Sequence, residues 1–300
     1  MQKHKRPSKR RSGIHAALAV CAVFLVAGVA NAQLVHRYSF TASDGITVTD
    51  SVSSAHGTLI NGSGGSSFNG GLLNLDNDGA ENSEALDIDY VDLPNGIISA
   101  LAPSATFEAW VIWDGGNDWQ RIYDLGISNA GEDQSSGGDN VYYTMMCPMH
   151  GGNGPIRAEL ACPLGEADQW LNTSASMANG VPVQVAATLD EANALYTLYF
   201  NGAAVNYLTV QDFALSKLTD NNNWLGRSQY NDPMFDGAIN ELRIYDRALS
   251  WGEVAGNYAA GADTVTGDGP GGIQFRRGDP DSSGGGNITD AIAVLNHLFA

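Results

Sequence analysis

Residues 195–210 have the sequence LYTLYF-NG-AAVNYLTV, in which two runs rich in apolar, aromatic and β-branched residues flank Asn201-Gly202. Both central residues of a type I′ turn need positive φ, which Asn and Gly adopt most readily. The stretch therefore predicts an antiparallel β-hairpin with strands over 195–200 and 203–210.

The same pattern continues in both directions along the chain. Residues 107–113 (FEAWVIW) alternate with period two and are largely apolar on both faces, as a strand inside a sandwich would be. Further strands are expected at 35–40, 71–75, 90–93, 121–125, 183–189 and 238–245, and one short helix at 250–258. About a dozen short strands without repeated helices predict an all-β fold, an antiparallel two-sheet sandwich formed as one domain by residues 33–260.

The amino-terminal 32 residues have the pattern of a secretory signal peptide. All their basic residues precede Ser12, an apolar stretch follows over 14–29, and Ala30-Asn31-Ala32 provides a cleavage site after Ala32. The apolar stretch is shorter than the roughly 20 residues that a spanning helix needs. The sequence therefore predicts export, to the medium or the cell surface, without a membrane span.

The charge of the remaining chain excludes one class of function. The whole chain carries a formal charge of -18, and residues 33–300 retain nine basic against 33 acidic residues. Such a surface repels phosphate backbones and anionic lipids, which argues against nucleic-acid binding. With 43% hydrophobic residues, the chain can nevertheless form a substantial core.

Several motifs, in order, carry a resemblance to a known family. They are HRYSF (36–40), DSV (50–52), HGTL (56–59), YVDLP (90–94), TFEAW (106–110), WLGRS (224–228), FDGAINELRIY (235–245) and RALS (247–250). Together they resemble the laminin-G-like, concanavalin A-type jelly-roll domains of secreted bacterial proteins over roughly residues 34–259. The resemblance implies two curved sheets packed face to face, used mainly to bind glycans or proteins, often with a structural Ca²⁺.

The last predicted strand suggests where that calcium would lie. In similar folds an aspartate often occupies the place of Asn240 and helps to hold the ion. The amide keeps an oxygen ligand but removes a charge, so we expect weaker binding here. Asp50 and Asp236 are further candidate ligands. Glu241 and Arg243 share one strand face and predict a structural ion pair.

The tail has a different composition. Residues 261–275 are Gly-rich and predict a flexible linker. Residues 276–300 resemble a single dockerin repeat, in which Gly284 would make the sharp turn of a Ca²⁺ loop whose oxygen ligands fall at loop positions 1, 3, 5, 7, 9 and 12: Asp279, Asp281, Ser283, Gly285 (through its carbonyl), Asn287 and Asp290. The resemblance implies a cohesin-like partner. An acidic, disordered tail is the alternative.

An apolar stripe follows this loop, formed by Ile288, Ile292, Leu295 and Phe299 at helical spacing. A dockerin normally has two repeats, and only one is present in these 300 residues. Either the sequence is part of a longer protein or a partner covers the stripe. With three carboxylates in the loop, we expect a calcium Kd on the order of 10⁻⁴–10⁻³ M.

Cys147 and Cys162 each follow a strand-like run, at 141–146 and 156–161, and a Gly-rich turn joins the runs. A hairpin in an oxidising compartment predicts a structural Cys147–Cys162 disulfide.

No catalytic residue is predicted. The chain has no H-E-x-x-H, G-x-S-x-G or C-x-x-C motif, and residues 84–89 (EALDID) lack the second glutamate of the E-x-D-x-x-E strand of related glucanases. Five aromatic residues in polar, loop-like segments could stack on sugar rings or pack at the rim of the sandwich: Trp119, Trp170, Trp224, Tyr230 and Trp251.

We therefore favour a secreted, non-catalytic binding module for a neutral glycan or a cell-surface protein, with a calcium-dependent docking tail. A divergent polysaccharide hydrolase or lyase on the same fold is one alternative. A purely structural domain of a larger cell-surface protein is the other.

Overall fold

The computed structural model describes residues 34–78, 88–101, 103–135, 141–162 and 166–265. The predicted signal peptide and the dockerin-like calcium loop lie outside these residues. Within them, no helix is long and apolar enough to cross a lipid bilayer.

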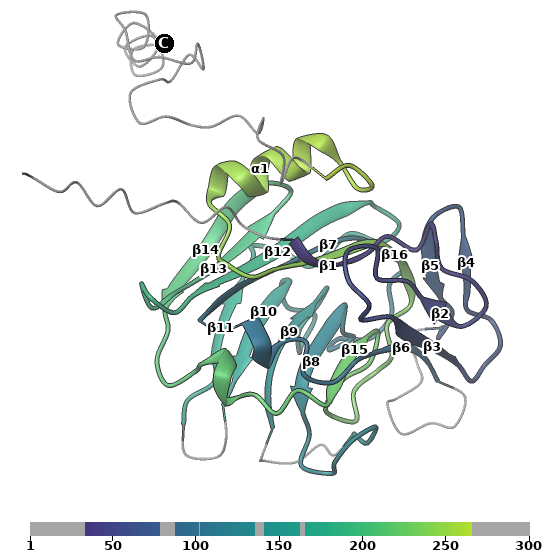
Figure 1. The fold of residues 1–300 in the computed structure, drawn as a ribbon, viewed down its shortest axis with the longest axis horizontal. Helices are drawn as coiled ribbons and strands as arrows, with labels where there is room; N and C mark the ends of the chain where they lie inside the picture. Colours follow the sequence, from purple (N-terminus) through teal and green to yellow (C-terminus); the bar gives the residue numbers. More distant parts are fainter. Residues whose placement is uncertain (1–33, 79–87, 102, 136–140, 163–165, 266–300) are drawn as a thin grey trace, which may run out of the picture. The chain divides into compact units, whose positions relative to one another are not determined.

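The described chain forms two stacked antiparallel sheets, which confirms the predicted all-β sandwich (Figure 1). Sheet A has the order β14 (Ala203–Thr209), β13 (Leu195–Phe200), β12 (Val183–Asp190), β7 (Ser104–Trp113), β16 (Gly237–Tyr245), β5 (Leu72–Leu75) and β4 (Ser67–Asn69), and β1 (Leu34–Tyr38) also pairs with β16. Sheet B has the order β11 (Gln169–Asn172), β10 (Arg157–Ala161), β9 (Tyr142–Cys147), β8 (Tyr123–Ile127), β15 (Asn222–Leu225), β6 (Asp89–Leu93), β3 (Gly57–Asn61) and β2 (Thr47–Val48).

The predicted hairpin is present as β13 and β14. Leu195 pairs with Thr209 at the open end, and Phe200 pairs with Ala203 next to the turn. Asn201 and Gly202 have φ of 49° and 78°, as a type I′ turn requires. The local sequence signal therefore determines this connection.

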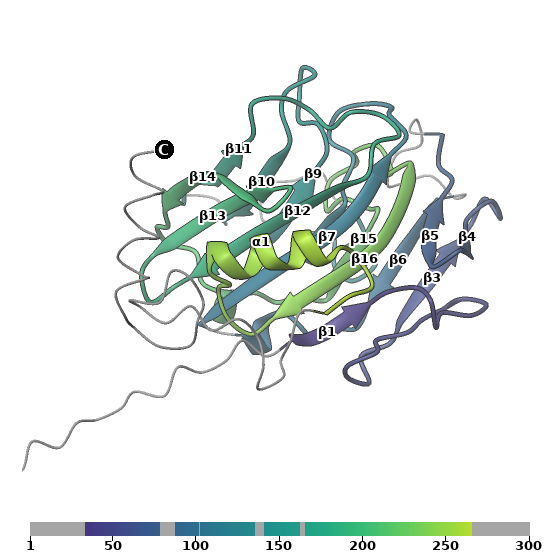
Figure 2. The same cartoon turned by 90° about the horizontal axis from the view of Figure 1, so that it is seen from above.

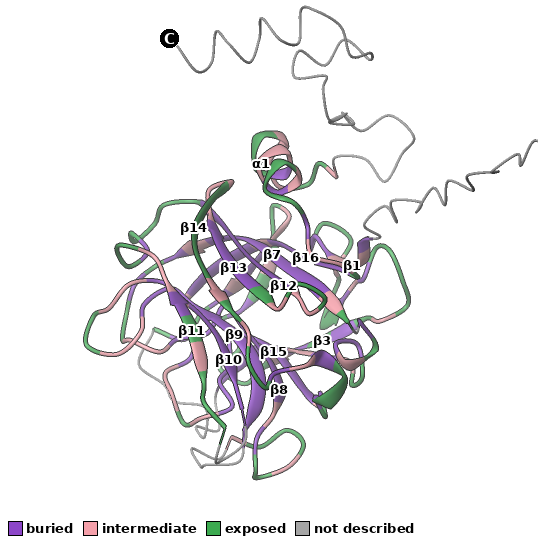
Figure 3. Cartoon of the chain, turned by 90° about the vertical axis from the view of Figure 1, so that its left-hand side faces the viewer, coloured by how far each residue is buried: buried purple, intermediate pink, exposed green. Residues whose placement is uncertain are grey.

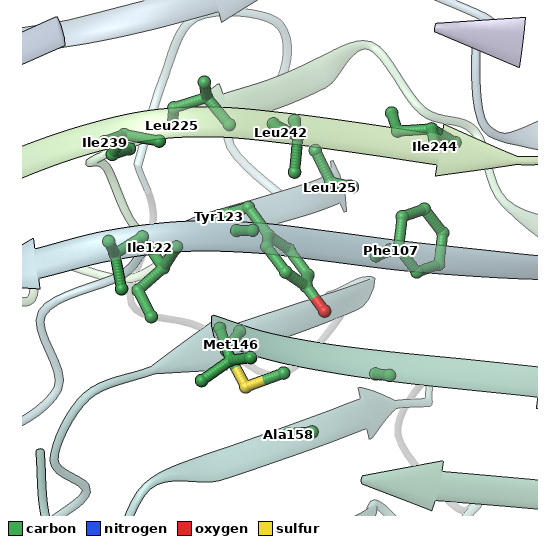
Figure 4. Close-up of a cluster of buried hydrophobic side chains, with 14 of the residues drawn as sticks. Phe107, Ile122, Tyr123, Leu125, Met146, Ala158, Leu225, Ile239, Leu242 and Ile244 are labelled. Atoms are coloured by element: carbon green, nitrogen blue, oxygen red, sulfur yellow. The ribbon is translucent and has the colours of Figure 1, made fainter. Parts of the chain in front are cut away.

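The hydrophobic core fills the space between the sheets (Figure 4). Phe107 of β7 and Leu242 of β16 meet Tyr123 of β8 and Met146 of β9, and all four are at most 1% exposed. Residues that alternate with these point away from the core. The central strands of both sheets are largely buried (Figure 3).

A short helix covers the outer face of sheet A. α1 (Trp251–Ala260) lies over β12, β7 and β16 (Figure 2). Ser250 and Glu253 form a capping box at its start. Val254 is fully buried in a cluster that includes Tyr199 and Tyr245 of the sheet. Two short 3₁₀ helices, η1 (Ser99–Leu101) and η2 (Leu215–Lys217), complete the described elements.

The predicted ion pair on β16 is also present. Arg243 donates to Glu241, and Arg37 of β1 donates to the same carboxylate at 2.8 Å. The Arg243 guanidinium lies 4.3 Å from the centre of the Trp110 ring. Residues beyond α1 join this group, because the Asp263 amide donates to Glu241 at 2.7 Å. The first residues assigned to the linker from sequence thus contact the sandwich.

The predicted Cys147–Cys162 disulfide is wrong. Both thiols are free and buried, although the hairpin of β9 and β10 is present. Cys147 pairs with Arg157 at one end of the hairpin, whereas Cys162 follows the Ala161–Tyr143 pair at the other end, which separates them by about 17 Å along the strands. They also face opposite sides of sheet B, since Cys162 belongs to the central core and Cys147 to a cluster on the outer face. In an antiparallel hairpin, the last residues of the two strands lie at opposite ends.

Candidate functional site

A single row of side chains crosses the outer face of sheet B. The strand registers align one residue from each of six neighbouring strands, in the order Trp170, Glu159, Met145, Asp124, Trp224 and Asp92. The residues that alternate with them along the strands, such as Leu171, Leu160 and Leu225, belong to the core. The row therefore points away from the core.

Exposure along this row is greatest at its β11 end. Trp170 is 48% exposed, whereas Asp124 and Trp224 are fully buried. The Arg227 guanidinium lies 4.3 Å from the centre of the Trp224 ring, and Tyr90 packs edge-on against the same ring. Trp224 therefore packs within the protein and presents none of its ring to solvent, which favours the packing role over the ligand contact.

Trp170 and Trp119 flank one arginine at the open end. The Arg157 guanidinium lies 4.9 Å from the centre of the Trp170 ring and 5.3 Å from that of Trp119. Its Nε donates to Asn172 Oδ1 at 3.0 Å, which fixes its position on β10. Contacts of this kind between a guanidinium and an aromatic ring are attractive. We refer to Trp119, Arg157, Glu159, Trp170 and Tyr230 as the aromatic face.

Trp119 is held rigidly despite lying in a loop. Its φ is 67°, a left-handed conformation that is strained for a bulky residue and that tends to occur at functional sites. Its amide donates to Met149 O at 2.8 Å, and its carbonyl accepts from Arg121 Nη1. A Cβ at Gly151 would lie only 2.7 Å from the indole nitrogen, so a glycine is needed for this close approach. The ring is therefore oriented before any ligand arrives.

Arg121 anchors this arrangement from below. It is 1% exposed, and it donates from Nε to Asp124 at 3.2 Å and from Nη2 to Asp232 at 2.8 Å. Burial lowers the pKa of Arg121, but the Asp232 and Asp124 carboxylates outweigh this effect, so the pKa is raised overall. Its charge is neutralised within the protein. It therefore orients Trp119 and is not available to attract an anion.

Glu159 supplies a polar group beside the rings. The Tyr143 hydroxyl donates to Glu159 Oε1 at 3.0 Å, and Arg157 Nη1 lies 3.4 Å from Oε2. Burial raises the pKa of Glu159, while the nearby arginines and Tyr143 lower it. Tyr230 packs edge-on against Tyr143 with 6.2 Å between ring centres. Glu159 is only 7% exposed and therefore orients Arg157 and Tyr143, while the partly exposed rings offer a sugar a surface for stacking.

Sequence reasoning missed Arg157 and Glu159. The signal that was available is RAELA (157–161), in which two charged residues stand two apart within an otherwise apolar strand. Residues two apart on a strand share a face, so this pattern places both charged side chains on the outer face of sheet B.

The row holds three acids, Glu159, Asp124 and Asp92, and any pair of them includes at least one buried carboxylate, which does not suit sugar cleavage. Glu159 and Asp124 are two strands apart, about 10 Å between backbones. Burial raises the pKa of Asp124 to about 7, against the effect of Arg121, and this carboxylate is closed off from solvent. Of the 84–89 run only residues 88 and 89 are described, and Asp89 is fully buried, accepting from Ser63 and Ser66. None of these acids forms a solvent-facing pair with another.

The structure does not bring the predicted calcium ligands of the sandwich together. Asp50 lies beside Tyr38, which pairs with Leu242, and its carboxylate accepts from His36, Ser53 and main-chain amides. Asp236 precedes the first residue of β16 and accepts from the Asn77 amide at 3.4 Å. Asn240 lies at a bulge between these two positions. Among the described residues, no three His, Cys, Asp or Glu side chains converge as a metal site.

The remaining predicted residues fall elsewhere. Trp251 is 73% exposed at the start of α1, on the opposite sheet from the aromatic face. The six tail ligands lie outside the described residues: Asp279, Asp281, Ser283, Gly285, Asn287 and Asp290.

Comparison with known proteins agrees with this architecture. A family model described as the concanavalin A-like lectin/glucanases superfamily matches residues 87–255. The sequence matches no curated protein sequence. Domain 4 of AbnA, a GH43 extracellular arabinanase from Geobacillus stearothermophilus solved in complex with arabinotriose, is similar in structure, with a TM-score of 0.56 and 19% identity over 75% of this chain and 98% of that one.

A second solved structure is more distant. A botulinum neurotoxin type C chain, whose cell entry is described as dependent on two ganglioside molecules, has a TM-score of 0.51 and 12% identity over 76% of this chain and 50% of that one. At these identities, both likenesses show the shared fold alone.

Proposed function

This chain belongs to the concanavalin A-like lectin/glucanase superfamily, and we propose that it is a secreted, non-catalytic module that binds a neutral glycan through the aromatic face of sheet B. The observation that carries the proposal is the stack of Trp119, Arg157 and Trp170. A rigid pair of rings loses little conformational freedom on binding, which favours affinity.

The charges favour a neutral ligand over an anionic one. Asp124 and Asp232 neutralise Arg121, and Glu159 lies beside Arg157. The net charge of -18 opposes a polyanion further. The arabinotriose bound to the arabinanase domain is in keeping with a neutral saccharide as the ligand.

The tail extends the proposal. A calcium-loaded loop at 279–290 would dock the module to a cohesin-like partner, and the signal peptide would deliver both to the outside of the cell. These statements depend on the sequence motifs alone.

A glycan array tests the function. We expect the purified protein to bind one or more neutral polysaccharides and to release no reducing ends from them. The double variant W119A/W170A should lose that binding, and W251A should keep it. Binding that survives W119A/W170A would contradict the assignment of the site, and reducing ends released in a manner that one acidic substitution abolishes would contradict the non-catalytic function.

Calcium is tested in the same experiment. EDTA should leave glycan binding by the aromatic face unchanged, because no three His, Cys, Asp or Glu side chains of the described residues converge there as a metal site. A loss of glycan binding in EDTA would instead assign a calcium-dependent ligand site.

A further inference from the structure

Two hollows lie beside the aromatic face, along the edge where β11 of sheet B meets β14 of sheet A. Figure 2 shows these two strands next to each other. The first has a volume of about 280 Å³ and the second of about 300 Å³. Small-molecule sites usually begin at about 300 Å³, so these volumes suit one small ring rather than a large ligand. Trp170 borders the first hollow and also belongs to the aromatic face.

The edge strands are tied together, so the hollows exist before a ligand binds. The Gln169 side chain donates to the Gln211 carbonyl and accepts from the Gln211 amide at 2.6 Å. Farther along, Asn206 Nδ2 donates to the Asn172 carbonyl at 3.0 Å, between the two hollows. These contacts connect the two sheets at their open side. A preformed site of this kind costs less to occupy.

The lining favours an uncharged, hydroxyl-rich ligand. The first hollow combines the Trp170 ring and Leu208 with the polar side chains of Asp168, Gln169 and Thr209. The second is bordered by hydroxyl and apolar side chains: Thr173, Ser174, Ser176, Phe200 and Val205. Among the residues that line them, none is basic, so neither hollow is suited to a phosphate or carboxylate group. Asp168 Oδ1 accepts from the Cys162 amide at 2.9 Å, which fixes that acid at the rim.

The hollows follow one another along the strand. Thr209 lines the first and Val205 the second, four residues apart on β14, which is about 13 Å. A ligand that reaches from Trp170 into both must therefore be a chain of several units. A compact ligand would occupy only the aromatic face.

We propose that these hollows are additional subsites, and that the ligand is a linear neutral oligosaccharide that runs from the aromatic face around β11 to β14. The inference rests on the proposed function, because it extends the site on which a sugar stacks. It adds the ligand's minimum size and its direction across the protein.

Titration calorimetry with oligosaccharides of increasing length tests the proposal. The probes are arabino-, xylo-, cello- and malto-oligosaccharides, each from the disaccharide to the hexasaccharide. In the series that binds, we expect affinity to rise about tenfold with length, as a further contact of about 1.4 kcal/mol would give.

Variants locate that gain. T209Y fills the first hollow and S174Y the second, and each should lower affinity for the hexasaccharide several-fold while leaving the disaccharide unchanged. A203Y is the matched control, because Ala203 is exposed on the same strand and lines neither hollow. W170A should lower the affinity for both the disaccharide and the hexasaccharide.

The outcomes separate this inference from the function. Equal affinity for short and long chains, or a hexasaccharide insensitive to both T209Y and S174Y, overturns the extended site and leaves the function standing. Failure of every series to bind overturns both. If affinity still rises with oligosaccharide length in T209Y and S174Y but no longer does so in A203Y, the oligosaccharide binds elsewhere. That result would also overturn the inference.

Discussion

Replacing Glu108 by glutamine should stabilise the protein increasingly as the pH rises. Glu108 lies on β7 beneath α1 and is fully buried. Its carboxylate accepts from Gln184 at 2.5 Å, Asn257 at 2.9 Å and the Tyr245 hydroxyl at 3.3 Å, while Arg243 Nη1 is 4.0 Å away. Burial raises the pKa of Glu108 to about 7, although Arg243 and the hydrogen bonds lower it.

The magnitude follows from that shift. An unfolded glutamate titrates near its ordinary pKa of 4.5, so between about pH 4.5 and 7 the folded state holds a proton that the unfolded state has released. Folding stability therefore falls as the pH rises through this window. At 1.36 kcal/mol per pKa unit, the total is about 3 kcal/mol. The E108Q variant would carry no such cost, since an amide side chain does not ionise.

Urea denaturation of the wild type and E108Q, followed by tryptophan fluorescence from about pH 4 to about pH 8, measures the effect. The variant's free energy of unfolding should gain about 3 kcal/mol relative to the wild type across this range. Any cost of the altered hydrogen bonds does not depend on pH and cancels in that comparison. If the difference in free energy of unfolding between E108Q and the wild type stays constant, or if E108Q becomes less stable relative to the wild type as the pH rises, Glu108 is ionised and paired with Arg243.

A second glutamate provides a control of opposite sign. Burial raises the pKa of Glu253, but hydrogen bonds from Arg247 and Ser250 outweigh it and lower the pKa overall. Its stabilising contribution is present above the unfolded pKa and is lost as the pH falls. E253Q should therefore differ most from the wild type at neutral pH and least in acid.

Three further predictions concern the site and the cysteines. Trp170 is 48% exposed, and a sugar that covers about 60 Å² of its ring contributes about 1.5 kcal/mol of binding free energy. W170A should therefore weaken glycan binding about tenfold in calorimetry, while W251A should have no effect. Equal losses of affinity in both variants would refute the site. Peptide mass spectrometry should find Cys147 and Cys162 both alkylated in denaturant without prior reduction, and both protected from alkylation in the native state. If neither cysteine is alkylated in denaturant until a reductant is added, the two form a disulfide after all. G151A should displace the adjoining indole and reduce binding with little change in Tm, and unchanged affinity would show that the ring's orientation does not matter.

Local patterns predicted the elements of this fold well. Period-two alternation located β7 and β16, and Asn201-Gly202 defined the hairpin turn, because these signals depend on neighbours along the chain. Glu241 and Arg243 were correctly paired for the same reason, since residues two apart on a strand share a face.

The site depended on information that local patterns do not contain. Trp119, Trp170 and Tyr230 were named as candidates, but their convergence around Arg157 and Glu159 follows from the register of separate strands. Exposure is also set by tertiary packing. Trp224 and Trp251 looked equivalent in sequence, yet the first is fully buried and the second is 73% exposed.

The position of β16 has a consequence for how the protein is made. It pairs with β7 along one side and with β5 and β1 on the other, so residues 237–245 join parts of sheet A that are up to about 200 residues distant in sequence. The ribosome produces β16 after every other described strand, and until then β1 lacks its partner in sheet A. Such long-range pairing slows folding. Sheet A therefore cannot be completed until residues 237–245 have been synthesised.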